Sequence, residues 1–166
     1  MVIMDPGDYK QESEKAKNRI KIADHMLNIT YPMIKDTKLL IAVMDNLFLA
    51  VANSTTAILM FERYYKRVPL FPNNFDAKFE ILRAHVAERY AISKETLQML
   101  RNIKNLVLEH KKSPVEFSRR GEFVICTEDY QIRKLTIEDM KDYVNKAKVF
   151  INDVDRWISE DARNFR

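Results

Sequence analysis

The chain has 166 residues, of which 46% are hydrophobic and 31% are charged, a balance typical of a globular domain rather than a disordered segment. Its 28 Lys and Arg residues against 24 Asp and Glu give a formal net charge of +4. This mild excess fits a nucleic acid ligand or an ordinary solvated surface. Only two glycines are present, Gly7 and Gly121, which argues against a fold of many hairpins and against glycine-rich phosphate loops.

Cysteine usage and the N-terminus both bear on the compartment. Cys126 is the single cysteine, so the chain cannot form an intrachain disulfide or build a cysteine-based zinc site alone. Residues 1–9 contain no apolar segment followed by a cleavage site, so no secretory signal is visible. We therefore expect a cytoplasmic protein.

The first helix is predicted to begin near Tyr9, after a tail of residues 1–8 in which Asp8 can cap it. Its apolar residues recur at three- and four-residue steps, at Ala16, Ile20, Ala23, Leu27 and Thr30. Pro32 is expected to end or kink this helix. Residues 9–166 are predicted to form one domain.

A second helix is predicted from a cap at Asp36 to about Tyr65. Apolar residues surround much of this helix, as expected for the most buried one. The segment from Leu39 to Phe61 is long enough to span a membrane, but it contains Asp45 and two asparagines, which are costly in hydrocarbon. We therefore expect a helix buried inside a bundle, and no membrane partner.

Two further helices are predicted after a connection that contains two prolines. One spans Phe75 to Tyr90, and the other runs from Lys94, capped by Ser93, to about Lys111. The pattern leaves open whether these are one bent helix or two separate ones.

Between Phe117 and Leu135 the residues alternate in character, which predicts a small β-hairpin or flap that must pack on the helices or on a partner. The last helix begins at Thr136, where Thr136-Ile137-Glu138-Asp139 is close to a capping box. The predicted fold class is therefore mainly all-α, an up-down bundle of about five helices with a short β-hairpin or flap before the last helix.

Side-chain spacing excludes several common sites. No glutamate is followed by a histidine three residues later, which a carboxylate-bridged metal pair in a bundle requires. His-Glu-x-x-His, the phosphate-loop fingerprints and Gly-x-Ser-x-Gly are also missing from the sequence. His85 and Glu88 could share a metal or a proton, but no third ligand is identifiable. We expect neither a metal nor a cofactor.

The fourth predicted helix carries Arg101 and Asn102 and, near its end, His110. In this motif, and in its layout of a bundle with a long second helix rich in small residues, the chain resembles the HEPN (higher eukaryotes and prokaryotes nucleotide-binding) domains over most of its length. In the ribonucleases of that family an arginine, a polar residue and a histidine share one motif, and two chains pair so that their motifs face each other. The resemblance implies a homodimer and offers a nucleotidyltransferase-type protein as a partner.

The spacing within this motif departs from the family pattern. Eight residues separate Arg101 from His110, so the two side chains point in different directions and lie about 13 Å apart along a regular helix. Lys104 has a family-like spacing to His110, but a lysine lacks the forked donors of arginine. If cleavage occurs, the resemblance makes His110 the general base for a ribose 2′-hydroxyl, with Arg101 or Lys104 on the phosphate. The alternative is a surface histidine at a helix C-terminus.

Basic residues gather at two places beside aromatic ones, after Tyr65 and around Phe117. The candidate nucleic-acid-binding residues are Lys66, Arg67, Lys111, Lys112, Arg119 and Arg120. This mixture suits base stacking with phosphate contact, although helix ends show it too. We expect a non-catalytic HEPN-like module that binds a partner protein or a nucleic acid (RNA or DNA) as a homodimer. The alternatives are a metal-independent ribonuclease and a purely structural or regulatory helical protein.

Overall fold

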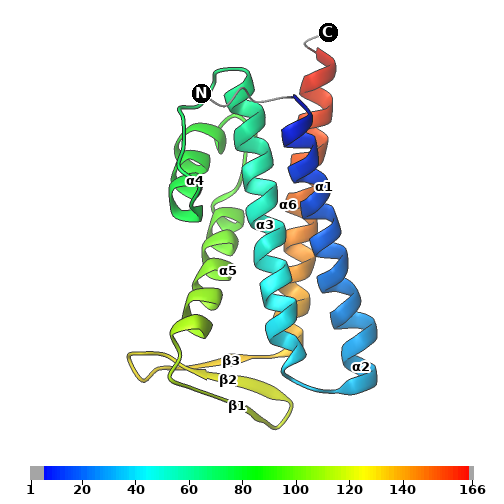
Figure 1. The fold of residues 1–166 in the computed structure, drawn as a ribbon, viewed down its shortest axis with the longest axis vertical. Helices are drawn as coiled ribbons and strands as arrows, with labels where there is room; N and C mark the ends of the chain where they lie inside the picture. Colours follow the sequence, from blue (N-terminus) through cyan, green and yellow to red (C-terminus); the bar gives the residue numbers. More distant parts are fainter. Residues whose placement is uncertain (1–5, 165–166) are drawn as a thin grey trace.

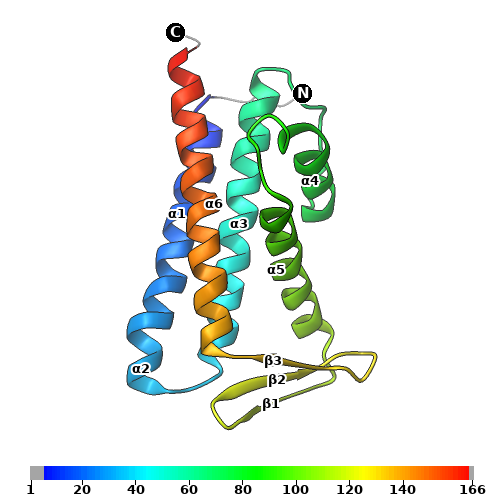
Figure 2. The ribbon, with the colours of Figure 1, turned by 180° about the vertical axis from the view of Figure 1, so that it is seen from behind.

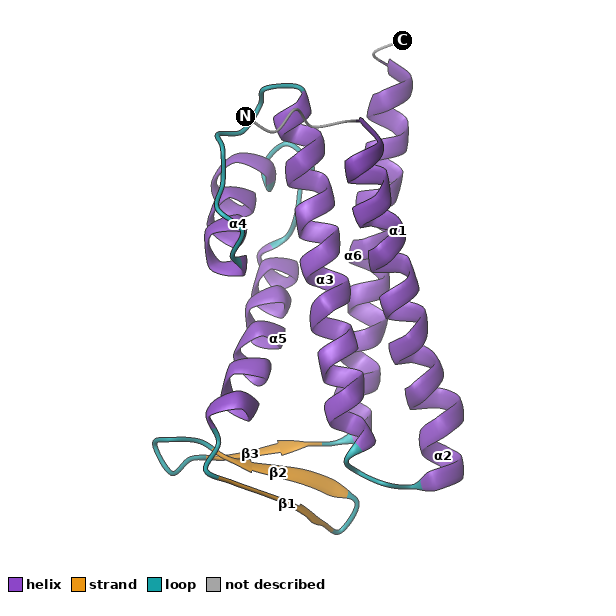
Figure 3. Cartoon of the chain, in the orientation of Figure 1, coloured by secondary structure: helices purple, strands orange, loops and turns teal. Residues whose placement is uncertain are grey.

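The computed structural model describes residues 6–164 of the chain, and the side chains of residues 8–160. Four long helices run along a common axis, and a small antiparallel sheet lies across one end of them (Figures 1 and 3). The helices are α1 (Pro6–His25), α3 (Leu39–Tyr64), α5 (Lys94–Lys112) and α6 (Ile137–Asn164). The predicted fold class, a mainly helical bundle with a short β element before the last helix, is confirmed.

The first helix begins earlier and continues further than the sequence predicts. It already includes Pro6, Gly7 and Asp8, since proline is tolerated in a first turn, where its missing N–H is not needed. Residues 1–5 of the predicted tail lie outside the described part of the chain.

Pro32 does not end this helix. After α1, residues Met26–Thr30 form a wide π-helical turn, and α2 (Tyr31–Ile34) follows with Pro32 in its first turn. Proline cannot donate to the carbonyl four residues before it, and a widened turn is one way to accommodate that loss. The helix ends at Ile34, and Lys35 turns the chain with a φ of 56°.

Helix α3 occupies the centre of the bundle, with α1 and α6 along one side and α4 and α5 along the other (Figures 1 and 2). The predicted cap at Asp36 is wrong, because the N-cap position is Lys38 and no side chain caps the helix. Asp36 Oδ1 instead accepts a hydrogen bond from Lys38 N at 2.9 Å in the turn before the helix. Apolar residues that are fully buried along it include Leu40, Val43, Met44, Leu47, Ile58, Leu59 and Phe61. By length and composition α3 is also the one helix in residues 6–164 that could cross a membrane, a test that core helices pass as well.

The next two helices are separate rather than one bent helix. α4 (Phe75–Ile81) passes into a second π-helical turn over Leu82–Val86, shorter than the regular helix predicted to Tyr90. Ala91 then adopts a φ of 53°, and Ser93 caps α5 by accepting a hydrogen bond from Thr96 N at 3.1 Å.

Three strands form the sheet, where the sequence predicts two. β1 (Val115–Arg119) pairs with β2 (Glu122–Cys126), which pairs with β3 (Ile132–Leu135), all antiparallel. Phe123, Ile125 and Leu135 share one face and are buried against the helices. The connection to α6 has the predicted cap, with Thr136 Oγ1 accepting from Asp139 N at 3.1 Å.

A buried ion pair holds the other end of the bundle together. Glu62, which is 0% exposed, accepts two hydrogen bonds from Arg67, at 2.8 Å from Nε and 3.0 Å from Nη2. The hydroxyl of Tyr90 donates to the same carboxylate, and the Tyr90 ring stacks on Trp157 with 4.8 Å between centroids. This cluster joins α3, the connection before α5, and α6.

Candidate functional site

The three candidate catalytic side chains do not converge. The Arg101 guanidinium lies 5.0 Å from the Phe79 ring centroid and 3.4 Å from a carboxylate oxygen of Glu80, both on α4. The Lys104 ammonium lies 5.2 Å from the ring of Phe48 on α3. Both cations therefore lie on the side of α5 that faces α3 and α4.

His110 faces the sheet instead. Its Nδ1 lies 2.7 Å from an Oε1 of Glu116 on β1, and both side chains are half-buried. A carboxylate at this position orients the imidazole, as it does in many sites that use a histidine as base. Neither Arg101 nor Lys104 reaches it, so the phosphate-binding cation that a ribonuclease site requires is not supplied by those two residues.

The two groups of basic residues lie at opposite ends of the bundle. Lys66 and Arg67 follow the C-terminal end of α3, far from the sheet (Figure 1). Arg67 is engaged by Glu62, and its guanidinium carbon lies 5.1 Å from the Tyr65 ring centroid. The two groups of basic residues therefore do not share one surface that a single ligand could contact.

Lys111, Lys112, Arg119 and Arg120 belong to the sheet end. The two lysines are exposed at the last turn of α5, directly before β1, and the two arginines are exposed at the turn from β1 to β2. These four cations therefore occupy the end of the bundle that the sheet covers (Figure 3).

The sheet has one covered face and one open face. On the covered face, Glu116 contacts His110, and Ser118 is hydrogen-bonded to Thr37. On the same face, Arg133 forms a bidentate ion pair with Glu109, with N–O distances of 2.7 and 2.9 Å. The strand register places the alternate residues together on the other side, because side chains of a strand alternate between faces. The outer face, as we call this open surface, consists of Val115, Phe117, Arg119, Glu122, Val124, Cys126, Ile132 and Lys134.

The outer face combines apolar surface with positive charge. Val115, Phe117 and Ile132 are exposed by 54%, 42% and 66%, and a shallow hollow of about 250 Å³ lies among the side chains. Arg119 and Arg120 line this hollow, while Lys134 is 3.7 Å from its one acidic lining residue, Glu122. The surface therefore presents an aromatic ring between cations.

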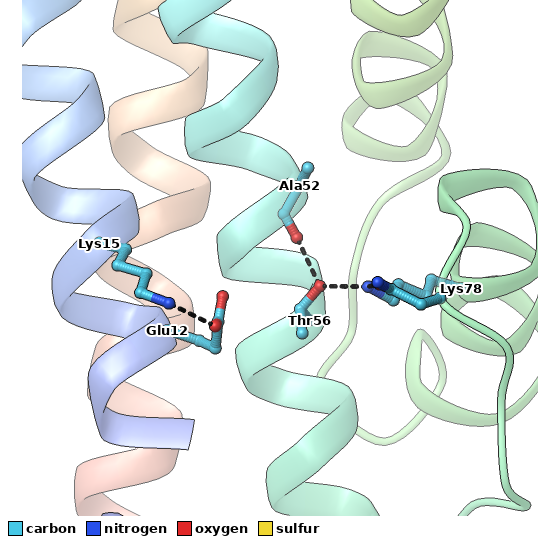
Figure 4. Close-up of polar contacts among 6 residues, drawn as sticks. Glu12, Lys15, Ala52, Thr56 and Lys78 are labelled. Carbon is cyan, nitrogen blue, oxygen red and sulfur yellow. Dashed lines mark hydrogen bonds and ion pairs between the residues drawn. The ribbon is translucent and has the colours of Figure 1, made fainter. Parts of the chain in front are cut away.

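Lys78 marks a second site, which the sequence analysis missed. Figure 4 shows its side chain reaching from α4 to Thr56 on α3. The Lys78 Nζ lies 3.0 Å from Thr56 Oγ1 and 2.8 Å from Asn73 Oδ1. Burial lowers the pKa of the Lys78 ammonium, and the negative charge of Glu12 opposes that effect in part. Thr56 lies on another helix, 22 residues before Lys78 in the sequence, so no local pattern signals the site.

A groove with a volume of about 680 Å³ lies between α5, β3 and α6, the elements seen from behind in Figure 2. Its charged side chains are largely matched, since Lys146 pairs with Asp142 at 2.9 Å and Arg133 pairs with Glu109. Burial raises the pKa of Tyr143 on its wall. The groove thus offers little unbalanced charge to a ligand.

Within residues 6–164 there is no group of three or more His, Cys, Asp or Glu side chains that could hold a metal ion. Comparison of the chain with known protein families, curated proteins and solved structures finds no match.

Proposed function

We propose that this chain is a non-catalytic helical module that binds single-stranded nucleic acid on the outer face of its sheet. The observation that carries the proposal is the exposed Phe117 ring set among Arg119, Arg120 and Lys134. Aromatic rings bind unpaired bases by stacking, and neighbouring cations bind the phosphates, a combination that favours a single strand over a duplex.

The charge on this end supports a polyanionic ligand. The hollow has three cations and one carboxylate among its lining residues, and Lys111 and Lys112 lie exposed at the start of the same sheet. Phosphate contacts of this kind give sequence-independent binding, with dissociation constants of about 10⁻⁴ to 10⁻⁶ M at physiological salt.

The non-catalytic part of the proposal rests on the separation of Arg101, Lys104 and His110. A cleavage site needs a base and a phosphate-binding cation around one scissile bond. Here the two cations pack on aromatic rings beside α3 and α4, while the histidine pairs with Glu116 at the sheet. We therefore infer that any bound RNA is retained intact.

Charge reversal at the sheet tests the proposal. For Arg119→Glu/Arg120→Glu we expect at least tenfold weaker binding of oligouridine, measured by fluorescence anisotropy at low salt. Because each contacted phosphate of a single strand contributes about 0.7 to the slope of log K against log salt, the slope should fall by about 1.4. Intact RNA recovered after incubation with the wild type would agree with a module that does not cleave.

A matched control separates local contact from net charge. Lys10→Glu/Lys94→Glu changes the formal charge equally, at exposed positions on α1 and at the start of α5. It should leave the salt slope unchanged. Equal loss in both variants, or RNA cleavage that disappears in His110→Ala, would overturn the proposal.

The HEPN-like resemblance, the homodimer, the nucleotidyltransferase-type partner and the cytoplasmic location stay predictions. Sedimentation of the chain at high micromolar concentration tests the homodimer, and a monomer there would count against the paired arrangement of the family.

A further inference from the structure

The pocket around Lys78 lies between α1, α3 and α4, away from the sheet. It has a volume of about 340 Å³, within the size range of small-molecule sites. Its polar lining comes from Glu12, Asn53, Thr56, Asn73, Asn74 and Lys78, and its apolar lining from Phe48, Ala52 and Phe75. The site is thus a half-apolar pocket with one cation, Lys78, and one carboxylate, Glu12, in its wall.

The Lys78 ammonium is held in place by neutral acceptors. Thr56 Oγ1 donates its own hydrogen to the carbonyl of Ala52 at 2.9 Å, which leaves its lone pairs for Lys78. Asn73 Oδ1 takes a second of the three ammonium hydrogens. Two of the three donors of Lys78 are therefore fixed, and the lysine cannot swing freely into solvent without losing both.

No carboxylate in the described residues lies within ion-pairing distance of Lys78. Glu12, the acid whose charge acts on Lys78, is hydrogen-bonded to Lys15 at 3.1 Å, and Figure 4 shows this pair on α1. A half-buried ammonium without a contacting counter-charge is costly, and its lowered pKa reflects that cost. A ligand that brings a negative charge to Nζ would offset it.

Other lining groups complete a site for such a ligand. Asn53 is half-buried on α3 and makes no hydrogen bond with its side chain among the described residues, so its amide can donate to an anionic oxygen. The rings of Phe48 and Phe75 meet edge to face, with 5.4 Å between centroids, and offer an apolar wall to the rest of the molecule.

We propose that the Lys78 pocket binds a small anion, a carboxylate or a phosphate monoester attached to a compact apolar body. The oxygens of the anion contact the third ammonium hydrogen of Lys78 and the amide of Asn53, and the apolar body packs on Phe48 and Phe75. This site is separate from the outer face of the sheet, so it adds a second ligand to the module.

Titration of the full chain with phenyl phosphate, benzoate and inorganic phosphate, followed by two-dimensional NMR, tests this site. We expect saturable shifts at Lys78, Asn53 and Thr56 with phenyl phosphate or benzoate, and the tighter of the two identifies the anion. Benzyl alcohol, which keeps the ring without the charge, should bind at least tenfold more weakly.

Two variants at the lysine separate binding from folding. Lys78→Met should weaken the anion at least tenfold while a thermal melt shows that the chain still folds, and Lys78→Gln, which keeps hydrogen-bonding capacity, serves if the methionine variant does not fold. The control Lys94→Met, at an exposed lysine, should bind as the wild type does. Absent binding, or equal affinity in the Lys78 variants and the wild type, would overturn the proposal.

Discussion

Replacing Arg67 with methionine is expected to lower the free energy of unfolding by about 3 to 5 kcal/mol, as measured by urea denaturation. The change leaves the carboxylate of Glu62, which is 0% exposed, without the two hydrogen bonds of its bidentate ion pair with Arg67. Tyr90 and Arg89, whose Nε is 3.5 Å from Oε2, remain but do not replace the two lost hydrogen bonds. A buried charge that loses its partner costs more than the pair itself contributes.

The double variant Glu62→Leu/Arg67→Met separates the pair from its surroundings. Removing both charges also removes the stranded carboxylate, so the double variant should be more stable than Arg67→Met alone. Losses that simply add would show that the two side chains do not depend on each other. A single variant within about 1 kcal/mol of the wild type would contradict the buried ion pair.

Replacing Ile125 with alanine is expected to cost about 2 to 5 kcal/mol, because its side chain is fully buried between the sheet and the helices. The matched substitution Ile132→Ala removes the same atoms from the outer face, where the side chain is 66% exposed. That change should cost less than about 1 kcal/mol, the span of strand propensity at an exposed position.

Thermal or urea unfolding of the two isoleucine variants compares the two faces of the sheet directly. The difference depends on the register, which places Ile125 on the covered face and Ile132 on the open one. Equal losses would mean that the sheet does not pack on the bundle through the face that contains Ile125. The assignment of the opposite face as the exposed outer face would then be wrong.

Helix starts that carry a capping residue could be predicted from the sequence. Ser93 and Thr136 each accept a hydrogen bond from the backbone N–H three residues later, so those helix starts could be located from sequence alone. Pro32 was expected to end or kink the first helix. The helix continues through it to Ile34, because proline is compatible with the first turn of a helix, and a π-helical turn precedes it.

The functional surfaces could be predicted only in part. Arg119 and Arg120 were identified by their charge. The strand that carries Arg119, β1, was harder to predict, because it has no buried residue, whereas β2 has three in a row. Lys78 could not be identified, because its partner Thr56 lies 22 residues away and only tertiary packing brings them together. His110 meets Glu116 because the chain turns from the end of α5 into β1, which lies across the end of the bundle (Figure 1).

Methyl NMR during titration with single-stranded oligouridine tests the central claim most directly, because methyl groups report the two faces of the sheet separately. The proposed binding predicts shifts at Val115 and Ile132 on the outer face, with Ile125 and Leu135 on the covered face unchanged. Unchanged Val115 and Ile132 methyls at saturating oligonucleotide, or shifts confined to another part of the bundle, would contradict it.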